Sequence, residues 1–283
     1  MGGGFGLRNS GPLSNINMIV IKIGGGKLIN IQNIASDLAS QEEVAIVVHG
    51  GNYYLDEYSK KLGFEKKTLT APTGLTSRYT DKEVIELMYL TYAGLANKKI
   101  IAVMQKAGLN AVGLSGIDGK LVIGKKHAAL LAVENGKKKV IKDDLTGSVQ
   151  NINTVFLKYL LSQDMVPVIT PPVITTDGEV INVDGDKIAA KIATDLKAKS
   201  LIFLIEAPGL LTDLIDKKSV ITKVNQVNLE KLLPLISGRM KRKLLECIKL
   251  LDSGIEKIII ADGTIKLPIT NALKGGGTHV HKY

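Results

Sequence analysis

The chain has 283 residues, and its apolar fraction of 45% is typical of a folded globular protein rather than a disordered one. Its apolar runs are strand-sized and fall short of the roughly 18 residues of a membrane helix, and its single cysteine, Cys247, excludes an intrachain disulfide and a cysteine metal cluster. The net charge of +10 indicates affinity for an anion (a nucleotide, a nucleic acid, a membrane surface or an acidic protein), while an aromatic content of 4% argues against stacking on single-stranded nucleic acid.

Residues 1–17 are rich in Gly, Asn and Ser and show no hydrophobic periodicity. They lack the long apolar core of a signal peptide. We interpret them as a flexible extension or a vector-derived remnant, with the natural start at Met18. A cytoplasmic location is expected, since a chain with one cysteine fits a reducing compartment.

From residue 18 onward, strand-like and helix-like segments alternate. In the first half of the chain the pattern predicts strands at 18–23, 44–49 and 111–114, and helices at 31–39, 52–62 and 81–107, the last with Gly94 as a candidate kink. A hairpin-like excursion follows at 121–141, then a helix at 155–161, a strand at 165–169 and a hairpin turn at 176–179. The last part is predicted to contain helices at 186–196, 229–236 and 240–251, strands at 200–205 and 257–261, and an edge strand in the closing THVHK. Cys247 falls in one of these helices and is expected to be a small core residue. The alternation predicts an α/β sandwich with a largely parallel sheet, because its continuous apolar strands suit burial on both faces.

Two predicted strands end in glycines that precede a helix: K-I-G-G-G at 22–26 and H-G-G-N at 49–52. Glycines let the backbone approach an anion closely, and the following helix adds its positive end. Neither segment matches G-x-G-x-x-G or a Walker A loop. A tight surface turn explains either one alone, but together they predict a shared anion site at the carboxyl edge of the sheet. Lys22 shares a strand face with Val20, and His49 is interpreted as a packed turn residue rather than a catalytic base.

Three later motifs each allow a structural and a functional interpretation. The loop G-L-T-S-R-Y-T-D at 74–81 places Arg78 before a helix capped by Thr80 or Asp81, where it could clamp a carboxylate or simply be exposed. The segment N-V-D-G-D at 182–186 could cap a helix or form a weak calcium-like loop, but an EF-hand is excluded. The segment G-R-M-K-R-K at 238–243 could be a solvated basic helix start or a nucleic-acid patch.

The ordered set of these motifs resembles the amino acid kinase family, in particular its acetylglutamate kinase branch, from Met18 to the carboxyl terminus. The helix segment A-G-L-A-N-K at 93–98 adds to it. Within this branch the chain is most similar to kinases acting on an amino-group carrier protein, through G-L-S-G-I-D-G at 113–119, T-P-P at 170–172, N-V-D-G-D and G-R-M-K-R-K. Acetylglutamate kinases usually have Asn at the position of Asp184 and a less basic segment before the late lysine, which argues against free acetylglutamate as the substrate.

The resemblance implies a three-layer αβα sandwich with two lobes, of which residues 18–186 bind the amino-acid substrate and residues 187–283 bind ATP. It implies that Lys22 and Lys243 neutralise charge on the transferred phosphoryl group, with Lys241 as the second choice for the later position. Asp186 is expected to hold both lysines in place. The remaining expected contacts are phosphate at Gly24 and Gly25, the attacking carboxylate at Gly50 and Gly51, and the α-carboxylate end of the substrate at Arg78 and Asn182.

The implied reaction is ATP-dependent phosphorylation of the side-chain carboxylate of carrier-linked α-aminoadipate, glutamate or both, in lysine or arginine biosynthesis. Mg²⁺ is expected to be held mainly by phosphates, so no protein metal ligand is named. The family also implies a homodimer, with no membrane and no nucleic acid as partner. A basic rim would steer an acidic carrier, and its candidate contacts are Lys125, Lys126, Lys137, Lys138 and Lys139. The alternatives are a kinase of free N-acetylglutamate, another kinase of the same family (of aspartate, carbamate or uridylate), a basic nucleic-acid-binding protein and a non-catalytic nucleotide sensor.

Overall fold

The computed structural model describes residues 17–74, 76–134, 136–213, 216, 218–232, 245, 247–252, 255 and 257–282. Its centre is an eight-stranded sheet in the order β14-β16-β15-β13-β1-β2-β10-β5. These strands are β1 (Met18–Ile23), β2 (Val44–His49), β5 (Ala111–Ser115), β10 (Val166–Thr170), β13 (Ser200–Ile205), β14 (Lys223–Asn225), β15 (Lys257–Asp262) and β16 (Thr278–His281). Neighbouring strands are parallel except β15 and β16, which confirms the predicted largely parallel sheet.

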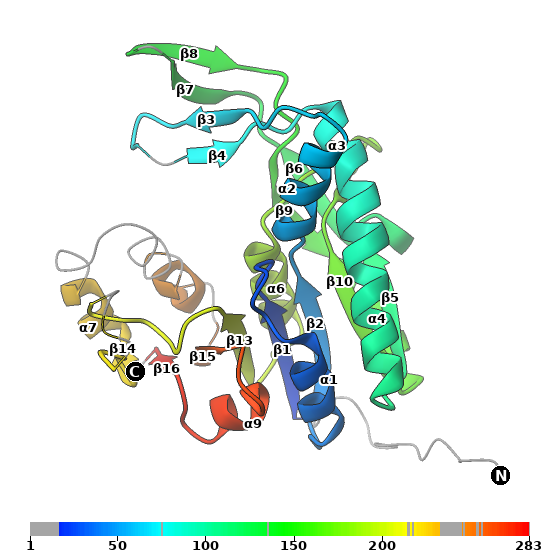
Figure 1. Cartoon of the computed structure of the whole chain (residues 1–283), viewed down its shortest axis with the longest axis vertical. Helices are drawn as coiled ribbons and strands as arrows, with labels where there is room; N and C mark the ends of the chain where they lie inside the picture. The colour runs from blue at the N-terminus through cyan, green and yellow to red at the C-terminus, as the bar shows by residue number, and fades with distance from the viewer. Residues whose placement is uncertain are drawn as a thin grey trace.

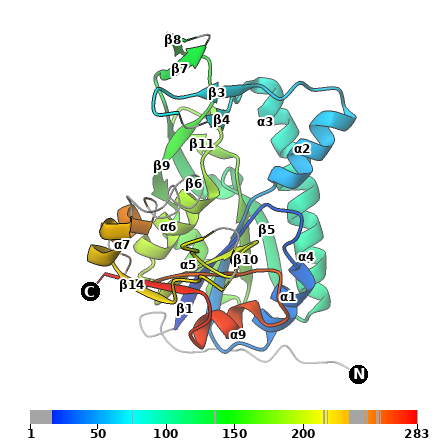
Figure 2. The ribbon, with the colours of Figure 1, turned by 60° about the vertical axis from the view of Figure 1, so that its left-hand side comes forward.

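Helices cover both faces of this sheet, as Figures 1 and 2 show, so the expected three-layer arrangement is confirmed. One face carries α1 (Ile31–Ala39), α4 (Asn97–Lys106) and α9 (Pro268–Leu273), and the other carries α5 (Thr154–Ser162), α6 (Gly185–Asp195) and α7 (Gln226–Leu232). Along β1, Ile21 packs into the core on the α1 and α4 side and Val20 into the core on the α6 side. Because successive side chains of a strand alternate, Lys22 shares the α6 side with Val20.

Smaller sheets project from one end of the central sheet. The first is a four-stranded sheet of β12 (Val180–Ile181), β11 (Val173–Thr175), β6 (Val122–Lys126) and β9 (Gly147–Ile152). The other two are the hairpins β3 (Thr68–Thr70) with β4 (Thr76–Arg78) and β7 (Leu130–Glu134) with β8 (Lys137–Ile141), which lie at the same end of the molecule (Figure 1). The predicted hairpin-like excursion at 121–141 therefore divides in two, since β6 belongs to the four-stranded sheet and only β7 and β8 form a hairpin.

A long helical run follows α2 (Asn52–Lys61) and the first hairpin. It consists of α3 (Lys82–Met88), the π-helical segment η2 (Tyr89–Ala96) and α4; the 3₁₀ turn η3 (Asp118–Lys120) lies beyond it. Asp81 caps α3 by accepting a 3.0 Å hydrogen bond from the Val84 N–H, as one of the two predicted caps should. The expected kink at Gly94 is instead a widened π turn that includes this glycine.

The prediction that the last strand of the chain lies at an edge of the sheet is wrong. β16 lies inside the sheet, antiparallel to β15 on one side and parallel to β14 on the other, with Thr278 and Val280 fully buried. The outer strand β14 has only three residues and no apolar run, so the sequence pattern did not reveal it.

Cys247 is buried, which confirms its interpretation as a core residue. The predicted helix at 229–236 is described only as far as residue 232, and residues 240–244 and 246 of the next predicted helix lie outside the described residues. Among the described residues, no helix has the length and apolar character needed to cross a membrane.

Candidate active site

The two glycine-rich strand ends meet, as predicted. β1 and β2 are parallel neighbours with Ile23 opposite His49, so both chains leave the sheet at the same edge. The Gly50 N–H donates to the Ile23 carbonyl at 3.2 Å, and the Tyr53 N–H at the start of α2 donates to the Gly25 carbonyl at 3.0 Å. Two backbone hydrogen bonds therefore fix the second loop against the first.

The space above Gly25 is bordered by backbone nitrogens. A Cβ atom placed on Gly25 would lie 3.0 Å from the Asn52 nitrogen and 3.1 Å from the Gly51 nitrogen. Asn52 is the first residue of α2, and the first N–H groups of a helix have no partner within that helix. Together with the positive end of the α2 dipole, this glycine-walled space fits an oxyanion. We refer to Gly24, Gly25, Gly50, Gly51 and the Asn52 N–H as the anion cradle.

Lys22 and Asp186 form an ion pair beside the cradle. The Lys22 Nζ lies 2.6 Å from Asp186 Oδ1, and the two side chains are 11% and 20% exposed. Asp186 is placed by the start of α6, where the Asp184 side chain caps the helix by accepting from the Asp186 N–H at 2.9 Å. Gly185 leaves room for the lysine, since a Cβ there would lie 3.1 Å from Lys22 Cε. The structure thus joins two predicted catalytic residues that are far apart in the sequence.

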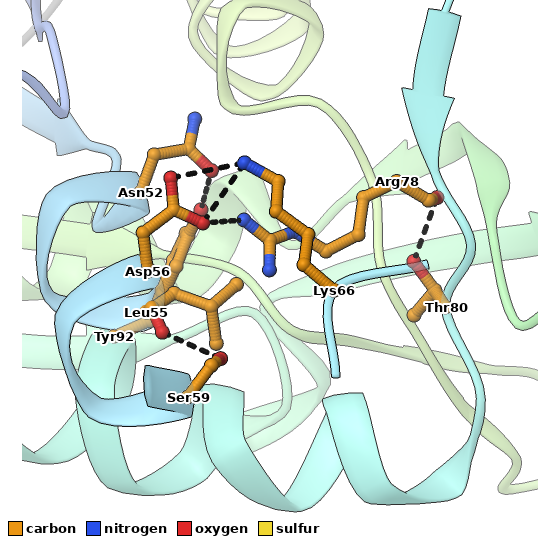
Figure 3. A network of polar contacts seen from close by, with 8 residues as sticks. All are labelled: Asn52, Leu55, Asp56, Ser59, Lys66, Arg78, Thr80 and Tyr92. Carbon is orange, nitrogen blue, oxygen red and sulfur yellow. Dashed lines mark hydrogen bonds and ion pairs between the residues drawn. The ribbon is translucent and has the colours of Figure 1, made fainter. Parts of the chain in front are cut away.

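Arg78 lies at the end of β4 and is held by an acid that the sequence motifs did not point to. Its guanidinium donates to Asp56 on α2, and Lys66 Nζ lies 3.2 Å from the same carboxylate (Figure 3). These contacts lower the pKa of Asp56 despite its partial burial. Asp56 lies one helical turn after the cradle residue Asn52. This spacing was the one feature of the sequence that could have pointed to Asp56 as a residue of the site.

Tyr92 is a second residue that the motifs missed. It lies on η2, its hydroxyl donates to Asn52 Oδ1 at 2.7 Å, and its ring packs against Gly51, where a Cβ would come within 2.6 Å of Cδ2. Burial raises the pKa of Tyr92 to about 12, and the Arg78 charge and the Gly51 N–H act in the opposite direction. Tyr92 therefore connects the cradle to the Arg78 region.

Backbone hydrogen bonds through Leu145 connect Asn182 to the segment that follows Arg78. Thr80, two residues after Arg78, accepts a 2.7 Å hydrogen bond from the Leu145 N–H, and the Leu145 carbonyl accepts a 2.8 Å bond from the Asn182 N–H. The buried Asp144 carboxylate supports this connection by accepting from the Thr80 N–H at 3.0 Å and from the Thr146 N–H at 2.9 Å. The two residues predicted to bind one end of the substrate are thus held by a shared frame.

Replacing Asp144 with Ala is expected to raise the KM for the amino-acid substrate about tenfold while the KM for ATP stays within twofold. The change leaves the buried Thr80 N–H and the partly buried Thr146 N–H without their acceptor, which costs about 1–3 kcal/mol for the buried group, and loosens the frame that holds Arg78 and Asn182. Steady-state kinetics with each substrate varied separately measures this. Asp37→Ala is the matched control, because Asp37 is an equally buried carboxylate that accepts from the Ile269 and Thr270 N–H groups at the start of α9. Equal rises in both KM values would contradict the assigned role.

A cavity of about 500 Å³ opens beside the cradle on the α1 and α4 side of β1. Its wall includes the glycines of both loops together with Lys27, Tyr53 and Lys99. A second groove of about 490 Å³ lies between the two hairpins and is lined by Lys67, Tyr79 and Lys139. This second groove begins next to Arg78 and reaches the β7–β8 hairpin.

The sequence profile of the amino acid kinase family matches residues 17–262. The chain belongs to the amino acid kinase family. It is 40% identical over 268 residues to the "[LysW]-aminoadipate kinase" of Thermus thermophilus, covering 93% of this chain and 100% of that protein. It is 35% identical over 266 residues to the "[LysW]-aminoadipate/[LysW]-glutamate kinase" of Metallosphaera sedula, covering 93% and 100%.

Solved structures of this amino acid kinase fold agree with the architecture. The N-acetylglutamate synthase of Neisseria gonorrhoeae, solved with coenzyme A and N-acetyl-glutamate, superposes with a TM-score of 0.76 at 18% identity, covering 94% of this chain and 60% of that one. The carbamate kinase of Giardia superposes with a TM-score of 0.65 at 14% identity, covering 95% and 100%. At these identities the likeness concerns the fold.

Two predicted residues of this amino acid kinase, Lys243 and its alternative Lys241, lie outside the described residues together with the whole of 238–243. The expected contact of a second lysine with Asp186 stays a prediction. Within the described ranges, no group of three or more His, Cys, Asp or Glu side chains is arranged to hold a metal ion.

Proposed function

We propose that this amino acid kinase transfers the γ-phosphoryl group of ATP to the side-chain carboxylate of an α-aminoadipate or glutamate whose amino group is joined to a small acidic carrier protein. The product is an acyl phosphate, in lysine or arginine biosynthesis. The observation that carries the proposal is the Lys22–Asp186 pair beside the anion cradle, in a chain 40% identical to a "[LysW]-aminoadipate kinase".

The chemistry needs charge stabilisation more than acid–base catalysis. A glutamate-like carboxylate, with a pKa near 4.3, is already ionised at neutral pH, so no base must remove a proton. One of its oxygens forms a bond to the γ-phosphorus, while the bond from that phosphorus to the bridging oxygen of ADP breaks and its electron pair stays on ADP. The obstacle is repulsion between two anions, which fixed N–H groups and a lysine charge reduce.

The residues of the site fit these needs. The Lys22 ammonium, held by Asp186 and only 11% exposed, supplies a positive charge with a fixed direction. The cradle offers backbone N–H donors where a side chain would not fit, which suits phosphate or carboxylate oxygens. Mg²⁺ accompanying ATP would neutralise phosphate charge, and its ligands would be mainly phosphate oxygens and water. Lys243 is proposed to supply a second positive charge to the transferred phosphoryl group, in addition to that of Lys22.

The other end of the substrate is proposed to bind between Arg78 and Asn182. Residues 18–186 would then form the amino-acid lobe and residues 187–283 the ATP lobe, with α6 crossing from one to the other. A cytoplasmic homodimer that has no membrane or nucleic acid as partner completes the proposal, on the expectations of the family.

The carrier is proposed to bind at the hairpin end of the molecule. Lys137, Lys138 and Lys139 are exposed on β8, whereas Lys126 on β6 is paired with Glu179 at 2.7 Å. The groove between the two hairpins leads from β8 to Tyr79, the neighbour of Arg78. A basic hairpin followed by a groove to the site suits an acidic carrier that presents its substrate on an extended chain.

Charge reversal of the hairpin, Lys137→Glu with Lys138→Glu, is expected to raise the KM for the carrier-linked substrate at least tenfold and to leave kcat and the KM for ATP unchanged. Electrostatic steering depends on ionic strength, so the effect should shrink as salt is raised. The control is Lys106→Glu with Lys274→Glu, the same change of charge on exposed lysines at the ends of α4 and α9. An equal effect of both pairs would assign the loss to net charge and contradict a binding surface on β8.

The proposed activity is tested by trapping the acyl phosphate with hydroxylamine in the presence of ATP and Mg²⁺. The substrates compared are carrier-linked aminoadipate, carrier-linked glutamate and free N-acetylglutamate, with the Lys22→Met enzyme as the inactive control. Hydroxamate from the carrier-linked substrates alone is the expected result. Turnover of free N-acetylglutamate alone would keep the chemistry and refute the carrier, and no product from any of the three would overturn the proposal.

A further inference from the structure

Two buried polar side chains, His49 and Asn97, contact each other directly behind the cradle. His49 ends β2 and is fully buried, and its Nδ1 lies 3.0 Å from the carbonyl oxygen of Gly50. Asn97 begins α4 and is 1% exposed, and its Nδ2 lies 3.0 Å from His49 Nε2 and 3.0 Å from the Val168 carbonyl oxygen. The proposed chemistry uses neither side chain.

These partners determine where the protons are. A carbonyl oxygen only accepts hydrogen bonds, so the Gly50 carbonyl requires a proton on His49 Nδ1. The Val168 carbonyl likewise requires the amide nitrogen of Asn97 on its side, and that same nitrogen then donates to His49 Nε2. Nε2 must therefore be unprotonated, and the ring is neutral. Burial lowers the pKa of His49 to about 4, and the nearby charges of Lys22 and Lys98 act in the same direction, while the Gly50 carbonyl opposes them.

The π-helical segment explains how Asn97 reaches this position. Asn97 follows Tyr92 by five residues, and an α-helix repeating every 3.6 residues would direct these two side chains differently. A π turn closes between residues five apart, so both can face the end of β2. Tyr92 contacts Gly51 and Asn52, while Asn97 contacts His49. One helix thus holds the β2–α2 turn at two points.

We propose that Asn97 is a positioning residue of the phosphoryl-transfer centre, acting through His49 on the peptide that joins Gly50 to Gly51. This inference rests on the proposed function. In a trans peptide the C=O and N–H groups point in opposite directions. Holding the Gly50 carbonyl against the imidazole therefore directs the Gly51 N–H away from it, toward the Tyr92 hydroxyl and the space above Gly25. Without Asn97 nothing keeps Nε2 unprotonated, and only the Gly50 carbonyl favours the Nδ1–H form, so the ring and this peptide can turn together.

The first test is nitrogen NMR of the full-length protein with ¹⁵N-labelled histidine, assigned by comparison with a His49→Gln protein. The expected spectrum shows a neutral His49 ring protonated on Nδ1 that does not titrate between pH 8 and 5.5. In Asn97→Asp the carboxylate cannot donate to Nε2, so Nε2 should become protonated near neutral pH. A wild-type ring protonated on Nε2 would overturn the proposal.

The second test is kinetic and uses Asn97→Leu, which removes the donor at similar size. Its kcat should fall about 10- to 100-fold, less than the roughly 10²- to 10³-fold cost of deleting one oxyanion donor, while both KM values stay within about threefold. Asn97→Asp should retain more activity at low pH, where the imidazolium keeps its Nδ1–H, and lose it as pH rises. The control is Asn153→Asp, which removes an exposed Nδ2–H bond to the Gly119 carbonyl, outside the cradle and its His49 support, and should leave kcat unchanged.

The results of these tests distinguish a failure of the positioning role of Asn97 from a failure of the proposed kinase function. An active wild-type enzyme whose kcat is unchanged in Asn97→Leu would refute the positioning role and leave the proposed function intact. A wild-type enzyme with no kinase activity would refute both, whatever the NMR spectra show of the ring. Thermal unfolding of each variant ensures that assays are run well below its Tm.

Discussion

Lys22→Met is expected to lower kcat by about 10²- to 10³-fold, equivalent to about 2.7–4 kcal/mol of transition-state stabilisation. Methionine keeps the length of the side chain but removes the charge that reduces repulsion between the carboxylate and the γ-phosphoryl group. The KM for each substrate should change much less than kcat, because the charge on the transferred oxygens develops in the transition state. Initial rates of hydroxamate formation with ATP and the carrier-linked substrate varied in turn measure this.

The partner of Lys22 gives the same prediction a second readout. Asp186→Asn should cost about tenfold in kcat, since the lysine keeps its charge but loses the carboxylate that holds it at 2.6 Å. The double variant should be no slower than Lys22→Met alone, because residues acting as a unit are not additive. The matched control is Lys191→Met with Asp195→Asn, an ion pair of 2.5 Å on the same helix α6. Additive losses at Lys22 and Asp186 would contradict a shared role.

The parts of the fold that the sequence predicted are those in which local pattern and burial agree. Strand β13 is apolar after its first residue and β1 is apolar except at Lys22, and a parallel sheet buries such runs on both faces. The short strand β14 and the inner position of β16 depend on pairing between segments far apart in the chain, which no local pattern encodes. The π-helical form of 89–96 was missed for the same reason, since Tyr92 and Asn97 find their partners on another element.

The candidate site divides in a similar way. The glycines and Lys22 were predicted because backbone permissiveness and a strand-end cation are local features, and their meeting with Asp186 followed from the family motif. Asp144 was missed because a single acid has no signal until the fold brings it to Thr80, and Asp56, which the fold brings to Arg78, offered only its one-turn spacing from Asn52. Supporting residues are therefore the part of the site that needs the structure.

Gly25→Ala is expected to lower kcat/KM by about 10²-fold or more. The new Cβ would lie 3.0 Å from the Asn52 nitrogen, 3.1 Å from the Gly51 nitrogen and 3.2 Å from the Gly50 carbonyl carbon. These neighbours are backbone atoms of a segment held at both ends, since the Gly50 N–H donates to Ile23 and the Tyr53 N–H donates to Gly25, so they cannot turn aside as a flexible side chain could. The methyl group would fill the cradle or force β1 and α2 apart, and a displacement of about 1 Å can cost 10²-fold in rate.

Two further alanine variants distinguish a filled cradle from general damage. Gly63→Ala meets no atom within 4 Å but has a φ of +76°, so it should lower Tm and leave kcat/KM unchanged. Gly50→Ala would touch Gly25 at 3.4 Å, an ordinary contact, so its Tm should stay near the wild-type value while its activity falls. Initial rates and thermal unfolding of the three proteins give the comparison. Full activity in Gly50→Ala would mean that the anion does not bind between the two loops, whereas activity lost at an unchanged Tm locates it there, because the methyl group then displaces only the ligand.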